Sequence, residues 1–387
     1  MRNIKKANTL ESKFPLLAVE QGCIISKAAD ITVAYEVTLP EIFTVTSQEY
    51  EAAHAAWCKA IKVLPDYSIV HKQDWFVKEN YAPDLQNSDM SFLSRSYERH
   101  FNERPYLHHQ CYLFLTKTTK ERMAHQSNFS TLCRGHIIPK EIKNKETVAR
   151  FLDAVEQFAR IINDSGYISL RRLTDDEITG TERTTGLVGK YLSLSTENVQ
   201  CLEDIELSAR GMRIGNKHLC LHTLSQTEDL PTEVSTDNRF ERLSTDRSDC
   251  RLSFAAPVGL LLSCNHIYNQ YVFIDNSDET LQRFEKTARN MHSLSRYSRQ
   301  NAINKEWIDE YLNEAHSQGL QSVRAHFNVL AWGEELEEKY IRKKPPLIQG
   351  VAISYYCVIF SNRKFSSINL CTFVSNFLLF WRRVSNK

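Results

Sequence analysis

Residues 243–275, LSTDRSDCRLSFAAPVGLLLSCNHIYNQYVFID, form the most core-like stretch of the sequence. Polar turn residues open this stretch at 244–249, and an apolar run follows at 254–262. The stretch ends in a cluster of aromatic and β-branched residues: Tyr268, Tyr271, Val272, Phe273 and Ile274. Because residues of these types favour strands, the cluster predicts a buried strand.

Two helical patterns follow this strand directly, at 278–294 and 304–316. Apolar residues recur in both patterns at the spacing of one helix face, and we expect that face to point inward. Its members are Leu281, Phe284, Ala288, Met291 and Leu294 in the first helix, and Trp307, Ile308, Tyr311 and Leu312 in the second. Gly319 is the expected C-terminal cap. Residues 322–332 then alternate between apolar and polar, which predicts a returning strand.

The first half of the chain shows a similar order of strands and helices. Alternation at 30–39 predicts a strand, a capping box of Thr46 and Glu49 begins a helix, and 67–76 return as a strand. The pattern then predicts a helix at 92–101, a strand at 106–116, and a helix at 144–164 with Asn144 as its N-cap. Residues 212–224 predict two short strands joined by a turn at Gly215 and Asn216.

These segments predict an α+β fold with mixed or antiparallel sheets and helices packed on one face. The long, irregular spacing between strands favours an antiparallel sheet over a regular parallel one. Because each half reads as strands separated by helices, we expect two ferredoxin-like units. The expected organisation is an amino-terminal α+β domain at 1–200, a second α+β domain at 201–338, and a divergent basic and hydrophobic tail at 339–387.

The charge of the chain is unevenly distributed, although its formal net charge is +1. Nine of the 48 Lys and Arg residues lie in 339–387, which has no Asp or Glu, so residues 1–338 carry 39 basic and 47 acidic residues, a net charge of −8. Broad binding to DNA needs clustered positive charge. The acidic body therefore argues against direct DNA binding.

The ten cysteines predict a reducing compartment. The sequence has no C-x-x-C motif, and most of the cysteines are flanked by apolar residues. The first residues lead into no long apolar run of the kind that a signal peptide needs. We therefore expect buried free thiols rather than a disulfide framework.

Five runs of sequence carry a resemblance to a known family. They are LESKFPLLAVE, AWCKAIKVLPDYSIVHKQDWF, SYERHFNERPYLHHQCYLFLTKTTKERM, the stretch 243–275, and LQRFEKTARNMHSLSRYSR. Over residues 1–338 the chain resembles the amino-terminal half of the TraG family, Bacteroidetes type, the large ATPases of conjugative transposon transfer. The resemblance implies a cytoplasmic protein, peripheral to the cytoplasmic face of the inner membrane, in a type IV secretion machine that transfers DNA. It implies as partners the inner-membrane components of that conjugation apparatus and full-length copies of the same ATPase, and no small-molecule substrate.

The ATPase chemistry of this family requires a phosphate-binding loop, G-x-x-x-x-G-K-[ST]. The nearest segment is GTERTTGLVGKY at 180–191, which has Thr184 in place of the first Gly and Tyr191 in place of the hydroxyl residue. We interpret it as a turn into a short helix. In the family the loop lies further along than the matched region, so we expect a docking and assembly region, truncated before its motor. It is expected to be no enzyme and to have no catalytic residues, cofactor or metal.

The alternative from another class is a stand-alone metal-dependent or nucleophile hydrolase. His218, Cys220 and His222 would share one face of a strand and include ligand types that zinc prefers, although a strand with one wet face explains the same pattern. The loop 244–251 brings together serines, acids and arginines: Ser244, Asp246, Arg247, Ser248, Asp249 and Arg251. Turn-forming residues with the arginines paired to the acids explain that loop as well.

Aromatic residues offer candidate anchors for a partner, but core packing is the preferred interpretation for Trp57, Trp75 and the aromatics of 106–114.

The tail 339–387 differs from the rest in charge and in resemblance, and both change at the same place. A tail translated out of frame or fused from neighbouring DNA is the favoured explanation. A membrane-contacting segment and an ordinary pair of buried strands are the alternatives. Residues 365–381 are shorter than the roughly 20 residues that span a bilayer.

Overall fold

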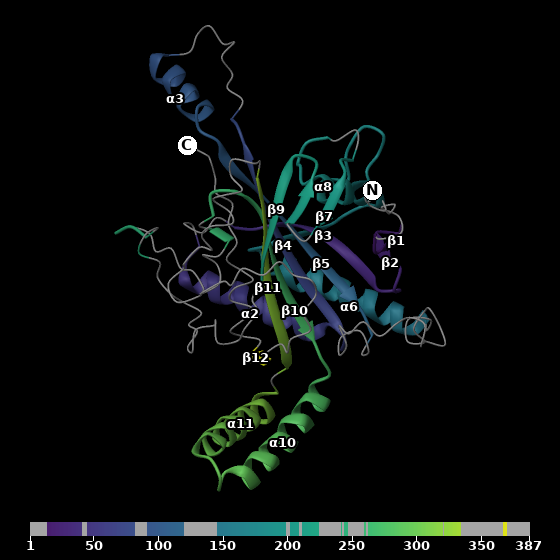
Figure 1. Ribbon diagram of the computed structural model, residues 1–387, viewed down its shortest axis with the longest axis vertical. Helices are drawn as coiled ribbons and strands as arrows, with labels where there is room; N and C mark the ends of the chain where they lie inside the picture. Colours follow the sequence, from purple (N-terminus) through teal and green to yellow (C-terminus); the bar gives the residue numbers. More distant parts are fainter. Residues whose placement is uncertain are drawn as a thin grey trace, which may run out of the picture.

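A computed structural model of the 387-residue chain gives the fold (Figure 1). The structure describes residues 14–40, 45–81, 91–119, 145–198, 202–208, 211–223, 241, 244–246, 259–260, 262–319, 321–333 and 367–369.

The described strands form one antiparallel sheet in the order β1-β2-β3-β5-β4-β10-β11-β9-β8-β7, with β6 beside β3 and β12 beside β11. The strands are β1 (Leu16–Glu20), β2 (Cys23–Ser26), β3 (Ile31–Thr38), β4 (Ser68–Glu79), β5 (Tyr106–Lys117), β6 (Ser169–Arg172), β7 (Ile205–Ser208), β8 (Gly211–Ile214), β9 (Lys217–Thr223), β10 (Asn265–Ile274), β11 (Ser322–Gly333) and β12 (Ser367–Asn369). The helices are α2 (Ser47–Val63), α3 (Phe92–Asn102), α6 (Lys145–Asp164), α7 (Asp175–Thr179), α8 (Leu187–Ser193), α10 (Ser277–Leu294) and α11 (Arg299–Gln318). The expected α+β class with an antiparallel sheet is confirmed.

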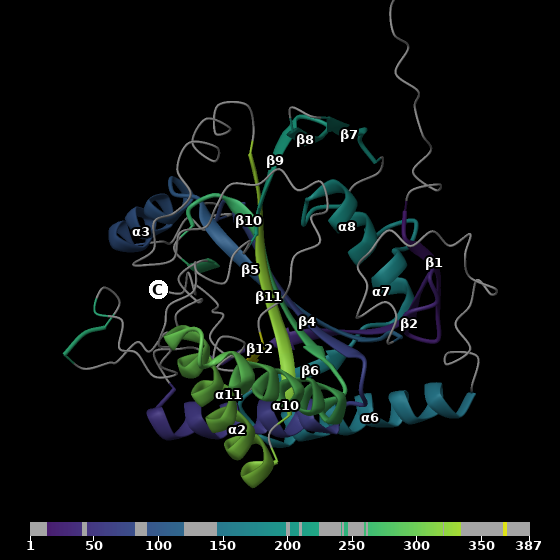
Figure 2. The ribbon, with the colours of Figure 1, turned by 60° about the horizontal axis from the view of Figure 1, so that its bottom comes forward.

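The first half of the chain is a ferredoxin-like unit. Its elements run β3-α2-β4-β5-α6-β6, and its strands pair antiparallel in the order β6-β3-β5-β4. This is the split β-α-β arrangement, in which both helices cross the same face of the sheet. The helices α2 and α6 lie side by side under that face (Figure 2).

The second half extends the same sheet rather than repeating the first unit. Residues 266–274 of β10 pair with 68–76 of β4, and β11 pairs with β10 on its other side. The second ferredoxin-like unit that we expected does not form, because β10 and β11 are direct neighbours and leave no place between them for a further strand. The two helices α10 and α11 are inserted between these strands as a hairpin (Figure 1).

The expected boundary near residue 200 therefore separates two segments that share one sheet. Both segments also contribute to one core: Tyr268, Val272 and Ile274 of β10 are fully buried in the cluster that contains Trp57 of α2 and Phe158 of α6. The rings of Trp57 and Phe158 meet edge to face, with their centroids 5.7 Å apart. The strand predicted from 268–274 is thus central to the molecule.

A second, smaller core covers the opposite face of the sheet. There Trp75 and Trp332 meet edge to face, and Ile178 of α7 and Leu187 of α8 pack against them. The helices α2 and α6 lie on one face of the sheet, as expected, while the short helices α7 and α8 shield part of the opposite face (Figure 2). Strands such as β4 are therefore buried on both sides.

Local signals in the sequence explain where the elements begin and end. Thr46 and Glu49 form the predicted capping box at α2, with the Glu49 amide donating to Thr46 Oγ1 at 3.3 Å and the Thr46 amide donating to Glu49 Oε2 at 2.8 Å. Gly215 forms the β8–β9 turn with a φ of 54°, and Gly319 ends α11 with a φ of 58°. Both angles lie in the left-handed region that glycine adopts without strain. The predicted N-cap Asn144 lies outside the described residues.

Two elements project from the sheet at opposite ends of the long axis: α3 at one end and the α10–α11 hairpin at the other (Figure 1). This projection corrects two inward positions of the sequence prediction, because Leu294 is 45% exposed and Trp307 is 63% exposed. Because the hairpin extends beyond the sheet, α10 and α11 cover only the side chains that face each other. The second helix also begins at Arg299, ahead of its predicted start at 304.

Candidate functional site

A buried charged cluster occupies the middle of the sheet, on the face under α2 and α6. Lys72 Nζ lies 2.5 Å from Asp74 Oδ2, and both side chains are fully buried. His109 Nε2 donates to Asp74 Oδ1 at 2.9 Å. Burial alone would raise the pKa of Asp74, but Lys72 and His109 hold that pKa below its usual value. The carboxylate therefore stays ionised.

The thiol of Cys111 belongs to this cluster, and its pKa is typical of a structural cysteine. Burial raises the pKa of Cys111 well above its usual value. Nucleophilic cysteines need the opposite shift, because the thiolate is the reactive form. Burial also lowers the pKa of His109, so the imidazole is neutral and donates one proton to Asp74. The arrangement compensates buried charge and holds β4 against β5.

The opposite face of the sheet carries a chain of polar contacts across three strands. His71 Nε2 and Gln73 Nε2 both donate to Asn269 Oδ1 at 2.9 Å, and Asn269 Nδ2 donates to Asn328 Oδ1 at 3.0 Å. The His71 ring is stacked on Tyr271, with centroids 4.1 Å apart. Burial lowers the pKa of His71 to about 4, so this histidine is neutral near pH 7.

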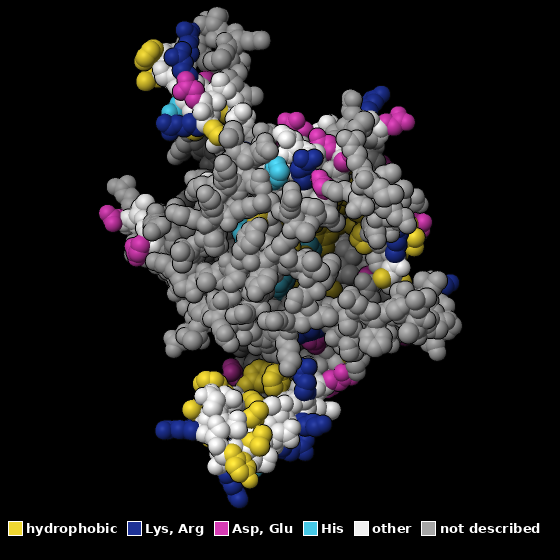
Figure 3. Space-filling view, viewed as in Figure 1, with side chains coloured by type: hydrophobic (Ala, Val, Ile, Leu, Met, Phe, Trp, Pro, Cys, Tyr) yellow, Lys and Arg dark blue, Asp and Glu magenta, His cyan; other side chains and the backbone are white. Residues whose placement is uncertain are grey.

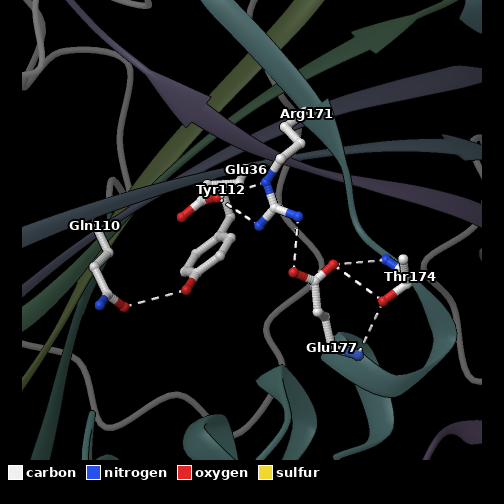
Figure 4. Close-up of polar contacts among 6 residues, drawn as sticks. All are labelled: Glu36, Gln110, Tyr112, Arg171, Thr174 and Glu177. Carbon is white, nitrogen blue, oxygen red and sulfur yellow. Dashed lines mark hydrogen bonds and ion pairs between the residues drawn. The ribbon is translucent and has the colours of Figure 1, made fainter.

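A third network ties the edge of the sheet to α7 (Figure 4). Arg171 of β6 donates to Glu36 at 2.7 Å and to Glu177 at 2.7 Å. Glu177 is also the capping partner of Thr174, whose backbone amide lowers the pKa of that carboxyl group. Because these side chains are about half exposed, each ion pair contributes at most about 1 kcal/mol to stability. The network fixes α7 against β3 and β6.

The predicted zinc ligands share a strand face, as expected from their spacing. His218, Cys220 and His222 alternate on β9, and Cys220 and His222 lie opposite Ala331 and Val329 of β11. Burial lowers the pKa of His222. Among the residues that the structure describes, however, no three His, Cys, Asp or Glu side chains are grouped so that they could hold a metal ion.

The predicted serine and arginine loop lies largely outside the described residues. Ser244 and Asp246 are described, whereas Arg247, Ser248, Asp249 and Arg251 are not. The hypothesis that this loop forms a hydrolase site stays a prediction.

The segment 180–191 is a turn followed by a short helix, the interpretation that its sequence favoured. Helix α7, not a strand, precedes it. The backbones of Gly180 and Gly186 approach so closely that a Cβ atom on Gly186 would lie 2.1 Å from Gly180 N. Tyr191 contacts Trp75 edge to face at 6.2 Å. These glycines therefore serve local packing.

The candidate aromatic anchors on the sheet belong to the core. Trp57 is fully buried and Trp75 is 1% exposed. The three most exposed large hydrophobic side chains of the described residues lie on the projecting elements: Phe92 and Leu93 of α3 are 83% and 78% exposed, and Tyr297 in the α10–α11 turn is 84% exposed. Sequence reasoning missed these residues, because their spacing alone does not tell an uncovered face from a core-facing one. The signal that could have found them is arginine beside each group, at Arg95, Arg99 and 296–299.

The turn of the α10–α11 hairpin is basic and its root is acidic. Residues 286–305 contain five Lys and Arg residues and no Asp or Glu, whereas residues 306–318 contain four Asp and Glu residues and no Lys or Arg. Figure 3 shows basic and hydrophobic side chains together on this projection. We call residues 286–305 the hairpin tip. It combines an exposed tyrosine with positive charge.

Comparison with known proteins gives one match to a family. Residues 3–55 match the family described as "Domain of unknown function, B. Theta Gene description" (DUF3875). In the described part, this match covers β1, β2, β3 and the start of α2. No curated protein matches the chain. No described helix has the length and apolar character needed to cross a membrane.

Proposed function

We propose that this chain is a non-catalytic docking and assembly region of a TraG-like ATPase of conjugative DNA transfer. The observation that carries the proposal is that the three most exposed large hydrophobic side chains of the described residues, Phe92, Leu93 and Tyr297, lie on two projecting elements. Contiguous exposed apolar groups on a folded domain, such as Phe92 and Leu93, mark sites of interaction. The five runs of sequence that resemble the family supply the identity of the machine.

The hairpin tip is proposed to seat the protein on inner-membrane components of the conjugation apparatus. Its five basic residues and exposed Tyr297 suit the anionic cytoplasmic surface around such a component. Basic residues gain about 1 kcal/mol each near such a surface, and tyrosine favours the interface between lipid and water.

Photo-crosslinking from the hairpin tip tests this proposal. A photoreactive amino acid would replace Tyr297 in one variant and Arg160, an exposed residue of α6, in a matched control. Both variants would be expressed in cells that carry a TraG-type conjugative element, and the crosslinked products identified by mass spectrometry. We expect inner-membrane transfer proteins from position 297 and not from position 160. The same products from both positions, or no transfer protein from position 297, would overturn the proposal.

A further inference from the structure

Helix α3 is an amphipathic helix that buries none of its residues in the described part of this chain. Glu98 on its inner side accepts a hydrogen bond from Tyr81 at 3.2 Å. The other side presents Phe92, Arg95 and Arg99, which lie three and four residues apart and so are neighbours on one helix face. All three are exposed. This face combines one aromatic ring with two guanidinium groups.

A groove between α10 and α11 offers the opposite chemistry. Its volume is about 650 Å³, and it is lined by His292 and Ser295 at the end of α10 and by Ala302, Glu306, Glu310 and Asn313 of α11. Lys305 also lines the groove, where its ammonium group is paired with Asp309 at 3.4 Å. Trp307, 63% exposed, lies one residue beyond Glu306 and three before Glu310. The groove thus presents three carboxylates, one of them paired with Lys305, and Trp307 lies outside its lining on the same helix.

The two surfaces agree in length as well as in charge. At a rise of 1.5 Å per residue, α3 is about 16 Å long, and residues 302–313 of α11 span about 16 Å. Arginine forms bidentate pairs with carboxylates and stacks on tryptophan. An amphipathic helix laid in a groove between two helices is a recurrent mode of recognition.

We infer that α3 of one copy binds the α11 groove of a second copy, so that the chain associates with itself head to tail. The two surfaces lie at opposite ends of the molecule, so they meet between copies rather than within one (Figure 1). A contact between two different surfaces leaves one of each unoccupied at the ends of a pair, and further copies can add. Such an arrangement closes into a ring or continues as a filament.

This inference rests on the proposed function as an assembly region and names one partner within it. It uses the carboxylates Glu306 and Glu310 of the groove, whereas docking to the inner-membrane component uses Tyr297 and the basic residues of the tip. A purified chain that stays monomeric would therefore remove the inference and leave the crosslinking result from Tyr297 unaffected.

Charge reversal at each surface separates this contact from other forms of association. One variant carries Arg95→Glu and Arg99→Glu, and the other carries Glu306→Arg and Glu310→Arg. A control carries Arg150→Glu and Arg160→Glu on α6, where both arginines are more than 70% exposed. Because all these side chains are on the surface, the variants are expected to fold, and circular dichroism would check this.

Sedimentation of the purified full chain gives the decisive result. We expect the wild type and the α6 control to associate, and each reversed variant alone to associate about a hundredfold more weakly, because like charges would face each other. An equal mixture of the two reversed variants would regain association, since each supplies the surface that the other has kept. We also expect the wild-type association to weaken as salt rises from about 50 mM to about 500 mM. A monomeric wild type, reversed variants that associate as the control does, or a mixture that stays apart would overturn the inference.

Discussion

Asp74 is the residue whose replacement tests the buried cluster most directly. Replacing it with Asn removes the carboxylate and leaves the Lys72 ammonium buried without its ion partner, which typically costs about 3–5 kcal/mol of unfolding free energy. Urea denaturation of Asp74→Asn against the wild type would measure this loss. Glu36→Gln is the matched control, because its half-exposed pair with Arg171 contributes at most about 1 kcal/mol. Equal losses from the two variants would show that the cluster is not buried as described.

The buried histidines make stability depend on pH. Burial lowers the pKa of His71, His266 and His326 to about 4 in the folded protein, against about 6.5 in the unfolded chain. Between these values the unfolded state binds more protons, so we expect the unfolding free energy to fall as pH drops from about 6.5 to about 4.

A variant at His326 isolates one of these contributions. Each such histidine adds up to about 1.4 kcal/mol per pH unit to the slope of the unfolding free energy against pH. The substitution His326→Gln would remove the contribution of this one histidine. Urea unfolding at several pH values measures the slope. An unchanged slope in this variant would mean that His326 titrates normally in the folded state.

The sequence predicts these strands but not their polar contacts. The run HKQDW at 71–75 lies within a predicted strand, and polar residues there suggest a wet face. In the structure β4 is covered on both sides, so Lys72, Asp74 and Gln73 are buried. Lys72 and Asp74 lie on the face covered by α2 and α6, and Gln73 lies on the face partly covered by α7 and α8. Because α6, α7 and α8 are distant in the sequence, no local pattern reports these contacts.

At the scale of elements, the α10–α11 hairpin is predicted to be separable from the sheet. Ile274 and Val323, which flank it, are already paired across β10 and β11. Replacing residues 277–319 with a short Gly-rich turn should therefore leave the sheet folded, with near-UV circular dichroism and cooperative urea unfolding retained.

Within the hairpin, a substitution between the two helices is predicted to cost more stability than a substitution on the outer face. Leu312 is 8% exposed and faces the hairpin interior, so Leu312→Ala is expected to cost about 2–5 kcal/mol in local stability, whereas Trp307→Ala costs little. Hydrogen exchange of amides in α10 and α11 measures both. Equal effects from the two substitutions would contradict the assignment of inward and outward faces.

Elements with strong local signals were predictable, and their partners were not. The capping box at Thr46 and the apolar stripe of α2 predict that helix and its buried face, and the aromatic run at 268–274 predicts β10. Leu294 and Trp307 fit the same helical spacing but are exposed. Periodicity indicates which residues share a face, but it does not indicate whether another element covers that face.

At the scale of the whole molecule, the proposal predicts no ATPase activity. Lys190 lies within α8, which follows α7 rather than a strand, and Tyr191 stands where a phosphate loop has a hydroxyl residue. Purified protein with magnesium and ATP is expected to release phosphate at the background rate, and Lys190→Ala should behave identically. Hydrolysis above background that Lys190→Ala abolishes would contradict this prediction.

The frequency of conjugative transfer tests the central claim, that this chain docks on the transfer machine, most directly. The chain would be produced in excess in donor cells that carry a TraG-type conjugative element, and compared with the hairpin-replacement variant at equal folded level. Because excess chain would occupy the site of the working ATPase, we predict that the intact chain lowers the transfer frequency about tenfold or more and that the variant does not. Equal transfer frequencies with and without the intact chain, or equal loss with both proteins, would contradict the account.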